Sequence, residues 1–108
     1  MSIIYSVQSA VTASPTIAFA SCELQRCLNR LDSDLPIQIM ESSQYNLTEP
    51  GLWLGLFSDV GLTPRSNHPF DDEIHVDVEG GNGLIAGANP RSLLMAVYRY
   101  LGELGCRW

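Results

Sequence analysis

The sequence predicts an α+β domain in which a mixed β-sheet carries two helices packed mainly on one face. Two long segments have apolar residues at helical spacing, and each begins at a polar residue followed by proline. Five short apolar or alternating segments, typical of strands, accompany them. The chain has 108 residues, of which 45% are hydrophobic, which is the size of one domain. The predicted element order is β-α-β-β-β-β-α.

The first strand and the first helix are predicted from residue type and spacing. Residues 3–7 are rich in β-branched and aromatic side chains and predict a strand. Ser14 is then a suitable N-cap and Pro15 a suitable first residue for a helix over residues 15–31. The apolar stripe of this helix consists of Ile17, Ala20, Leu24, Cys27, Leu28 and Leu31. Pro36 prevents the helix from resuming.

Two strands are predicted in the middle of the chain. Residues 36–40 alternate in polarity and predict a short strand. Residues 52–57 are apolar on both faces, which predicts a central strand covered on two sides. Residues 58–72, which contain a glycine and two prolines, are expected to form a long loop.

A hairpin and a second helix are predicted at the end of the chain. Residues 73–79 alternate, residues 80–83 are rich in glycine, and residues 84–87 form the returning strand. Asn89 and Pro90 are expected to open the second helix, and Gly105 to follow its end. Its apolar stripe consists of Leu93, Leu94, Val97, Leu101 and Leu104.

The charge balance argues against two classes of partner. Twelve carboxylates face six arginines, the chain has no lysine, and its formal net charge is −6. An acidic surface repels phosphate groups, so we expect neither nucleic-acid binding nor binding to an anionic membrane. No segment has 18 consecutive apolar residues and no signal peptide is recognisable, which predicts a cytoplasmic protein.

Cysteines and histidines indicate neither a metal site nor a catalytic site. Cys22, Cys27 and Cys106 are an odd number at wide spacing, so we expect reduced, mostly buried thiols and no metal. His68 and His75 lie in no motif of nucleophilic catalysis. No catalytic residue and no cofactor are therefore predicted, and the isolated chain is not expected to be an enzyme.

Two polar stretches have a structural explanation. The acidic residues 71–73, with His75, Asp77 and Glu79, contain metal-ligand types, but neighbours on one strand face are too far apart to share a small ion unaided. We therefore expect a solvated outer strand face. Residues 80–87 lack the spacing of a nucleotide-binding loop and precede a strand, so we expect a hairpin turn.

Trp53 and Phe57 are candidate interface residues. If the leucines of residues 52–57 face the helices, both aromatic rings lie on the opposite face of the sheet. An exposed apolar face would indicate an interface. Alternatively, a loop such as residues 58–72 covers the two rings.

Residues 83–108 resemble the end of the small N-terminal domain that precedes the catalytic barrel in α-glucuronidases and related glycoside hydrolases. This domain is in turn similar to the non-catalytic domain of β-N-acetylhexosaminidases. The resemblance rests on a strand that ends in Ile-x-Gly, a helix with a spaced pattern and a Leu-Gly-x-Arg-Trp exit. Ser92 and Tyr100 depart mildly from the pattern. The matching residues are Ile85, Gly87, Arg91, Ala96, Tyr98, Leu101, Leu104, Gly105, Arg107 and Trp108.

The resemblance implies that residues 1–108 are a single hexosaminidase-like accessory domain, and a fragment of a longer glycoside hydrolase. The parent's catalytic residues would lie in the barrel that follows. Arg107 and Trp108 would stand at the junction, and Trp108, with Trp53 or Phe57, would pack against that barrel. An isolated chain could form a homodimer through the same surface. The alternatives are a small carbohydrate-binding module and a free-standing protein-interaction domain.

Overall fold

The structure is a computed structural model, and it describes residues 2–8, 14–31, 37–46, 48–63, 73–80 and 82–105. The predicted α+β class is confirmed, with one additional short helix. The elements in chain order are β1 (Ser2–Val7), α1 (Pro15–Leu31), β2 (Ile37–Ser42), β3 (Leu52–Leu56), α2 (Phe57–Val60), β4 (Ile74–Glu79), β5 (Asn82–Gly87) and α3 (Pro90–Glu103).

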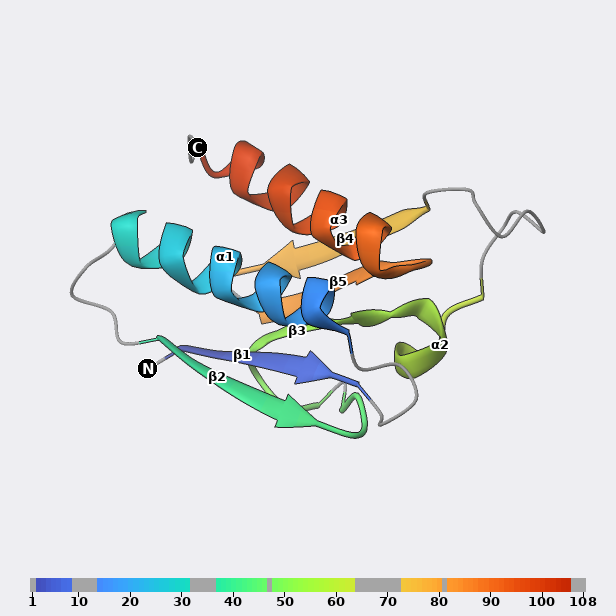
Figure 1. The fold of residues 1–108 in the computed structure, drawn as a ribbon. Helices are drawn as coiled ribbons and strands as arrows, with labels where there is room; N and C mark the ends of the chain where they lie inside the picture. The colour runs from blue at the N-terminus through green and yellow to red at the C-terminus, as the bar shows by residue number, and fades with distance from the viewer. Residues whose placement is uncertain are drawn as a thin grey trace.

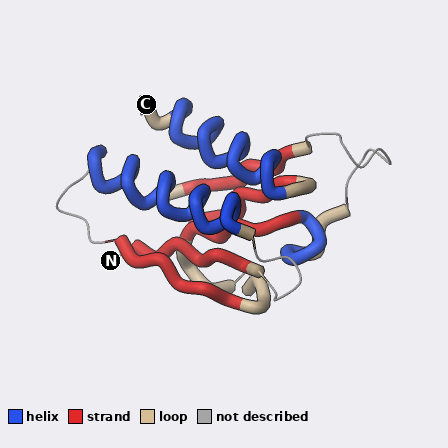
Figure 2. Tube along the Cα trace, in the orientation of Figure 1, coloured by secondary structure: helices blue, strands red, loops and turns tan. Residues whose placement is uncertain are grey.

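The five strands form one mixed sheet in the order β2-β1-β3-β5-β4. The pairs β1–β2, β1–β3 and β3–β5 are parallel, whereas β4 pairs antiparallel with β5. The two long helices, α1 and α3, lie side by side on one face of this sheet (Figure 1). The same two-layer arrangement is visible by element type in Figure 2. The predicted packing of both helices on one face is therefore confirmed.

Both long helices begin at the predicted caps. The Ser14 hydroxyl accepts a hydrogen bond from the Thr16 backbone N–H at 3.1 Å. Asn89 accepts one from the Ser92 N–H at 2.9 Å, and Pro90 occupies the first turn of α3. These side chains satisfy N–H groups that have no partner within a helix. Gly105 follows α3 with a φ of 84°, as predicted for the residue after a helix end.

The main core lies between the sheet and the two long helices. Leu54 of β3, Leu24 of α1 and Leu101 of α3 are all fully buried in it. The predicted central strand is confirmed, because every residue of β3 is buried. Leu31 and Leu104, predicted to belong to the apolar stripes, are instead 49% and 42% exposed. Leu31 is the last residue of α1, and Leu104 follows α3 as its C-cap.

The junction of β5 with α3 requires glycine. A Cβ atom built on Gly87 would stand 2.6 Å from the carbonyl carbon of Ser92 and would also clash with the Leu93 backbone. The absence of a side chain at Gly87 therefore lets the first turn of α3 approach the end of the strand. As a result, Ser92 and Leu93 are both fully buried.

One element departs from the sequence-based expectation. The strand ends at Leu56, and Phe57 begins the four-residue helix α2 where a strand end and a loop were expected. Phe57 and Val60 are both buried, and their spacing of three places them on one side of a helical turn. A single turn is too short to show a helical period in the sequence.

Two further findings concern the helices. Cys22 is exposed, so the expectation of mostly buried thiols holds for Cys27 but not for Cys22, and Cys106 lies outside the described residues. In the part of the chain that the structure describes, no helix has the length and apolar character needed to cross a membrane.

Candidate functional site

The face of the sheet opposite the long helices carries a cluster of aromatic rings. Tyr5 of β1 pairs with Trp53 of β3, and their rings stack with centroids 4.0 Å apart. Tyr45, from the segment between β2 and β3, meets the Trp53 ring edge-on at 5.3 Å. The indole N–H of Trp53 donates to the Glu49 carbonyl at 3.0 Å. Trp53 is thus held on several sides, and only 4% of it is exposed.

Trp53 belongs to a second hydrophobic core on this face of the sheet. Phe57, Val60, Leu84 and Ala86 belong to the same core. Phe57 is 5% exposed. Of the two alternatives for the aromatic rings, the structure shows the covered one. The cover over Phe57 comes from the expected segment, residues 58–72, through Val60 and Leu62. Tyr45, which sequence reasoning did not single out, covers Trp53.

Three neighbouring hollows border this second core. One of about 420 Å³ has Leu84, Tyr45, Asp77 and Glu79 among its lining residues. A second, of about 300 Å³, lies beside Tyr45 and Trp53. A third, of about 630 Å³, lies beside Phe57 and His75. The first hollow adjoins the other two, because it shares Tyr45 with the second and His75 with the third.

The side of the hollows formed by β4 is acidic. His75, Asp77 and Glu79 alternate with half-buried apolar residues, so the three polar side chains share one face of the strand. Asp77 and Glu79 are exposed, as expected for a solvated strand face. Burial raises the pKa of the Tyr45 hydroxyl, and the negative charge of Asp77 raises it further. Among the described residues, no three His, Cys, Asp or Glu side chains are grouped closely enough to hold a metal ion.

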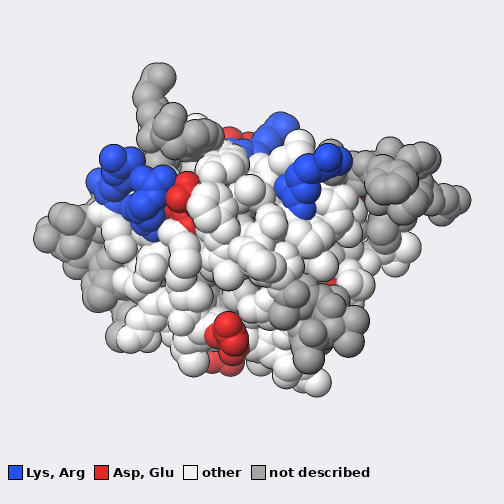
Figure 3. Space-filling model, in the orientation of Figure 1, with Lys and Arg blue, Asp and Glu red and all other residues white. Residues whose placement is uncertain are grey.

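Positive charge lies on the opposite side of the molecule. All the arginines within the described residues lie on the two long helices: Arg26 and Arg30 on α1, and Arg91 and Arg99 on α3. Basic side chains accordingly appear over the helical layer in Figure 3. The two long helices also carry Glu23 and Glu103, which pair with Arg26 and Arg99, so the helices hold charges of both signs.

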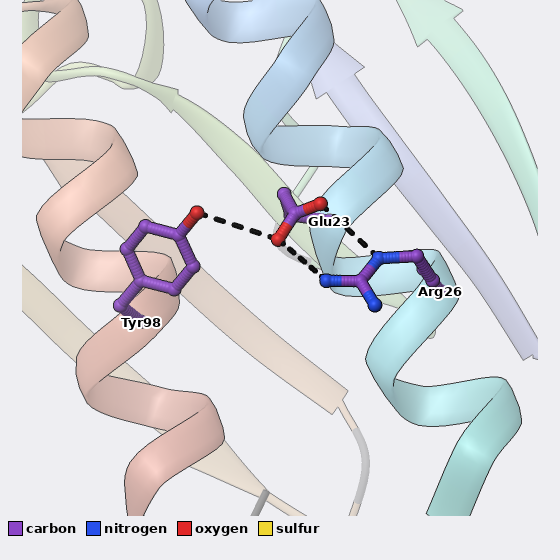
Figure 4. Close-up of polar contacts among 3 residues, drawn as sticks. All are labelled: Glu23, Arg26 and Tyr98. Atoms are coloured by element: carbon purple, nitrogen blue, oxygen red, sulfur yellow. Dashed lines mark hydrogen bonds and ion pairs between the residues drawn. The ribbon is translucent and has the colours of Figure 1, made fainter. Parts of the chain in front are cut away.

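A polar contact joins the two long helices. Arg26 donates to both carboxylate oxygens of Glu23, at 3.2 and 2.9 Å. The Tyr98 hydroxyl of α3 donates to the same carboxylate at 3.3 Å (Figure 4). The hydrogen bond from Arg26 lowers the pKa of Glu23, against a smaller opposing effect of burial. Burial and the charge of Glu23 raise the pKa of Tyr98. The geometry is that of a clamp between helices.

The sequence showed only part of this clamp. Glu23 and Arg26 are three residues apart on α1, a spacing at which helical side chains meet. Tyr98 was noted only as part of the motif in α3. Its contact with Glu23 spans 75 residues and depends on how α3 packs beside α1.

The remaining predicted residues lie elsewhere. Arg107 and Trp108, predicted as junction residues, are outside the described residues, as are His68, Asp71 and Asp72. The described structure therefore brings together Trp53 and Phe57 of the predicted interface set, in one buried cluster. Comparison of the chain with models of protein families and with curated proteins found no match.

Proposed function

We propose that this chain is a non-catalytic accessory domain of a glycoside hydrolase of the α-glucuronidase type, which packs against a following catalytic barrel. The observation that carries the proposal is the construction of the β5–α3 unit. Three residues of the motif pattern have packing roles in this unit. Gly87 lets the first turn of α3 approach the end of β5 closely, while Ala96 and Leu101 are fully buried in the core.

The helical layer supplies the surface that we assign to docking. Phe19 of α1 is 49% exposed and Met95 of α3 is 46% exposed. Glu23 contacts Tyr98, 75 positions further along the chain, and α1 and α3 run in the same direction in Figure 1. Because the two helices are parallel, residues whose numbers differ by 75 lie at about the same level along them. Phe19 therefore lies level with Leu94, the residue before Met95. Two large apolar side chains thus lie exposed at one level of the helical layer, whereas Trp53 and Phe57 are buried.

In the longer protein, this surface would scaffold one side of the barrel, and Arg107 and Trp108 would continue it toward the junction. The role is mechanical, because an accessory domain holds the barrel's surface in place and leaves the chemistry to barrel residues. An activity assay of the isolated chain on aryl-glycosides should therefore show no turnover.

The test begins with the reading frame that follows codon 108. A catalytic barrel requires about 250 further residues in frame.

Variants of the longer protein test the docking surface. Phe19→Asp and Met95→Asp should increase amide hydrogen exchange in the two long helices, and the matched change Met40→Asp on β2 should not. Met40 is a suitable control because it is 46% exposed but lies outside the helical layer. Equal effects of all three changes would contradict docking through the helices.

A carbohydrate-binding module is the second candidate, and Tyr45 is the observation that favours it. Its ring borders a hollow that also contains Asp77 and Asn82, and an aromatic ring beside polar groups suits a sugar. In a Trp108→Phe background, titration with gluco- and xylo-oligosaccharides should then change the fluorescence of Trp53, because Tyr45 contacts that indole. The change should be absent in Tyr45→Ala. No change at millimolar sugar would reject this candidate.

A further inference from the structure

We propose that the outer edge of β4 binds an extended basic segment of a partner protein, which joins the sheet as an additional strand. This inference does not depend on the accessory-domain assignment. It concerns a different surface from the helical layer, and it can hold or fail independently of that assignment.

The strand order places β4 at one end of the sheet. Within the described residues, β5 is the only strand that pairs with it. An edge strand presents backbone N–H and C=O groups that another chain can pair with. The first requirement for strand addition is therefore met at β4.

The hydrogen-bond pattern identifies which backbone groups face outward. The Glu73 carbonyl accepts from the Ala88 N–H at 3.0 Å, so Glu73 directs its backbone groups toward β5. Alternate residues of an antiparallel strand point their backbone groups in opposite directions. The N–H and C=O groups of Ile74, Val76 and Val78 therefore point away from β5, toward the free edge.

The side chains along this edge define the partner's chemistry. Ile74, Val76 and Val78 pack against the main core but remain only partly buried, so an added strand can extend their apolar cover. On the other face, Asp77 and Glu79 carry negative charge beside the hollow bordered by Tyr45. A segment in which apolar residues alternate with arginine or lysine would match both faces of β4.

Charge complementarity also argues against a second copy of this chain at β4. Pairing two copies edge to edge would bring the carboxylates of Asp77 and Glu79 close to the same groups of the partner. Like charges on neighbouring strands oppose pairing. The acidic face thus disfavours self-association while it favours a basic strand.

A labelled peptide tests the proposal. The probe is a capped peptide of about nine residues in which arginine alternates with valine, and binding to the full chain is followed by fluorescence anisotropy. We expect saturable binding that weakens as salt is raised, because exposed ion pairs are screened. The same peptide with glutamate in place of arginine should not bind. Binding of both peptides with equal affinity would overturn the proposal.

Protein variants distinguish strand addition from loose charge attraction. Val76→Pro removes an outward N–H without removing a hydrogen bond to β5, so it should reduce affinity at least tenfold while the circular dichroism spectrum is unchanged. Removing charge with Asp77→Asn and Glu79→Gln should weaken binding about three- to tenfold. If neither change alters the affinity for the peptide, the peptide binds at a site other than the edge of β4, and the proposal is wrong.

N-methylated peptides give a readout that does not depend on the folding of a variant. Methylation of alternate amides on the side that pairs with β4 should abolish binding, and methylation of the other set should leave it intact. Equal effects of the two sets would contradict strand addition.

Sedimentation of the chain alone tests whether a second copy occupies this edge. We expect no dimer that depends on β4. A dimer that dissociates when Val76→Pro is introduced would assign the edge to a second copy instead.

Discussion

Glu23 of α1 and Tyr98 of α3 meet at 3.3 Å, and this contact links the two helices of the layer assigned to docking. Tyr98→Phe removes the hydroxyl donor and leaves the ring. We expect the free energy of unfolding to fall by about 0.5–1.5 kcal/mol, the usual net value of one hydrogen bond. Urea denaturation measures it. Tyr100→Phe, on the same helix, is the matched control, and an equal loss there would contradict a specific role for the Glu23 contact.

The same carboxylate predicts a dependence of stability on pH. The pKa of Glu23 is lowered from 4.5 in the folded state, chiefly by the hydrogen bond from Arg26. A group with a depressed folded pKa contributes stability that is present above its unfolded pKa and is lost as pH falls through its folded pKa. The difference in unfolding free energy between the wild-type chain and Glu23→Gln should therefore be largest near pH 6–7. It should shrink below about pH 4.5. A difference that grows on acidification would have the wrong sign.

Gly87 is expected not to tolerate a side chain. Gly87→Ala forces a Cβ atom against the backbone of Ser92 and Leu93. Overpacking of this kind costs about 1–3 kcal/mol, and rigid backbone neighbours favour the upper end. Thermal unfolding checks the loss. Gly102→Ala, at an exposed position in α3, should instead raise stability because alanine has the higher helix propensity.

Tyr45 is expected to shield Trp53 from solvent. In a Trp108→Phe background, Trp53 is the only remaining tryptophan. Tyr45→Ala should then increase acrylamide quenching of Trp53 and shift its emission to longer wavelength, because one covering ring is removed. Tyr45→Phe keeps the ring and should behave like the parent. Unchanged quenching in Tyr45→Ala would show that Tyr45 does not cover the indole.

Local signals in the sequence predicted most of the secondary structure. Ser14 with Pro15 and Asn89 with Pro90 placed both helix starts, because capping depends on residues that are adjacent in the chain. Strand alternation placed β4 and predicted its solvated acidic face. The one-turn helix at Phe57 was missed because four residues carry no period.

The candidate site was harder to predict because it depends on contacts between distant segments. The side on which Trp53 lies followed from alternation, but its cover by Tyr45 depends on the path of residues 43–51. The link between Glu23 and Tyr98 likewise depends on the packing of α1 beside α3. Strand order, and with it the free edge of β4, is a property of the whole sheet that no single segment encodes.

We propose that this chain is the accessory domain of a longer glycoside hydrolase, and one observation on the gene can decide this. The most direct measurement is the nucleotide sequence that follows codon 108 in the gene. We expect an open frame of about 250 or more residues with the alternating strand and helix pattern of a catalytic barrel. A stop codon immediately after Trp108 in the intact gene would contradict it.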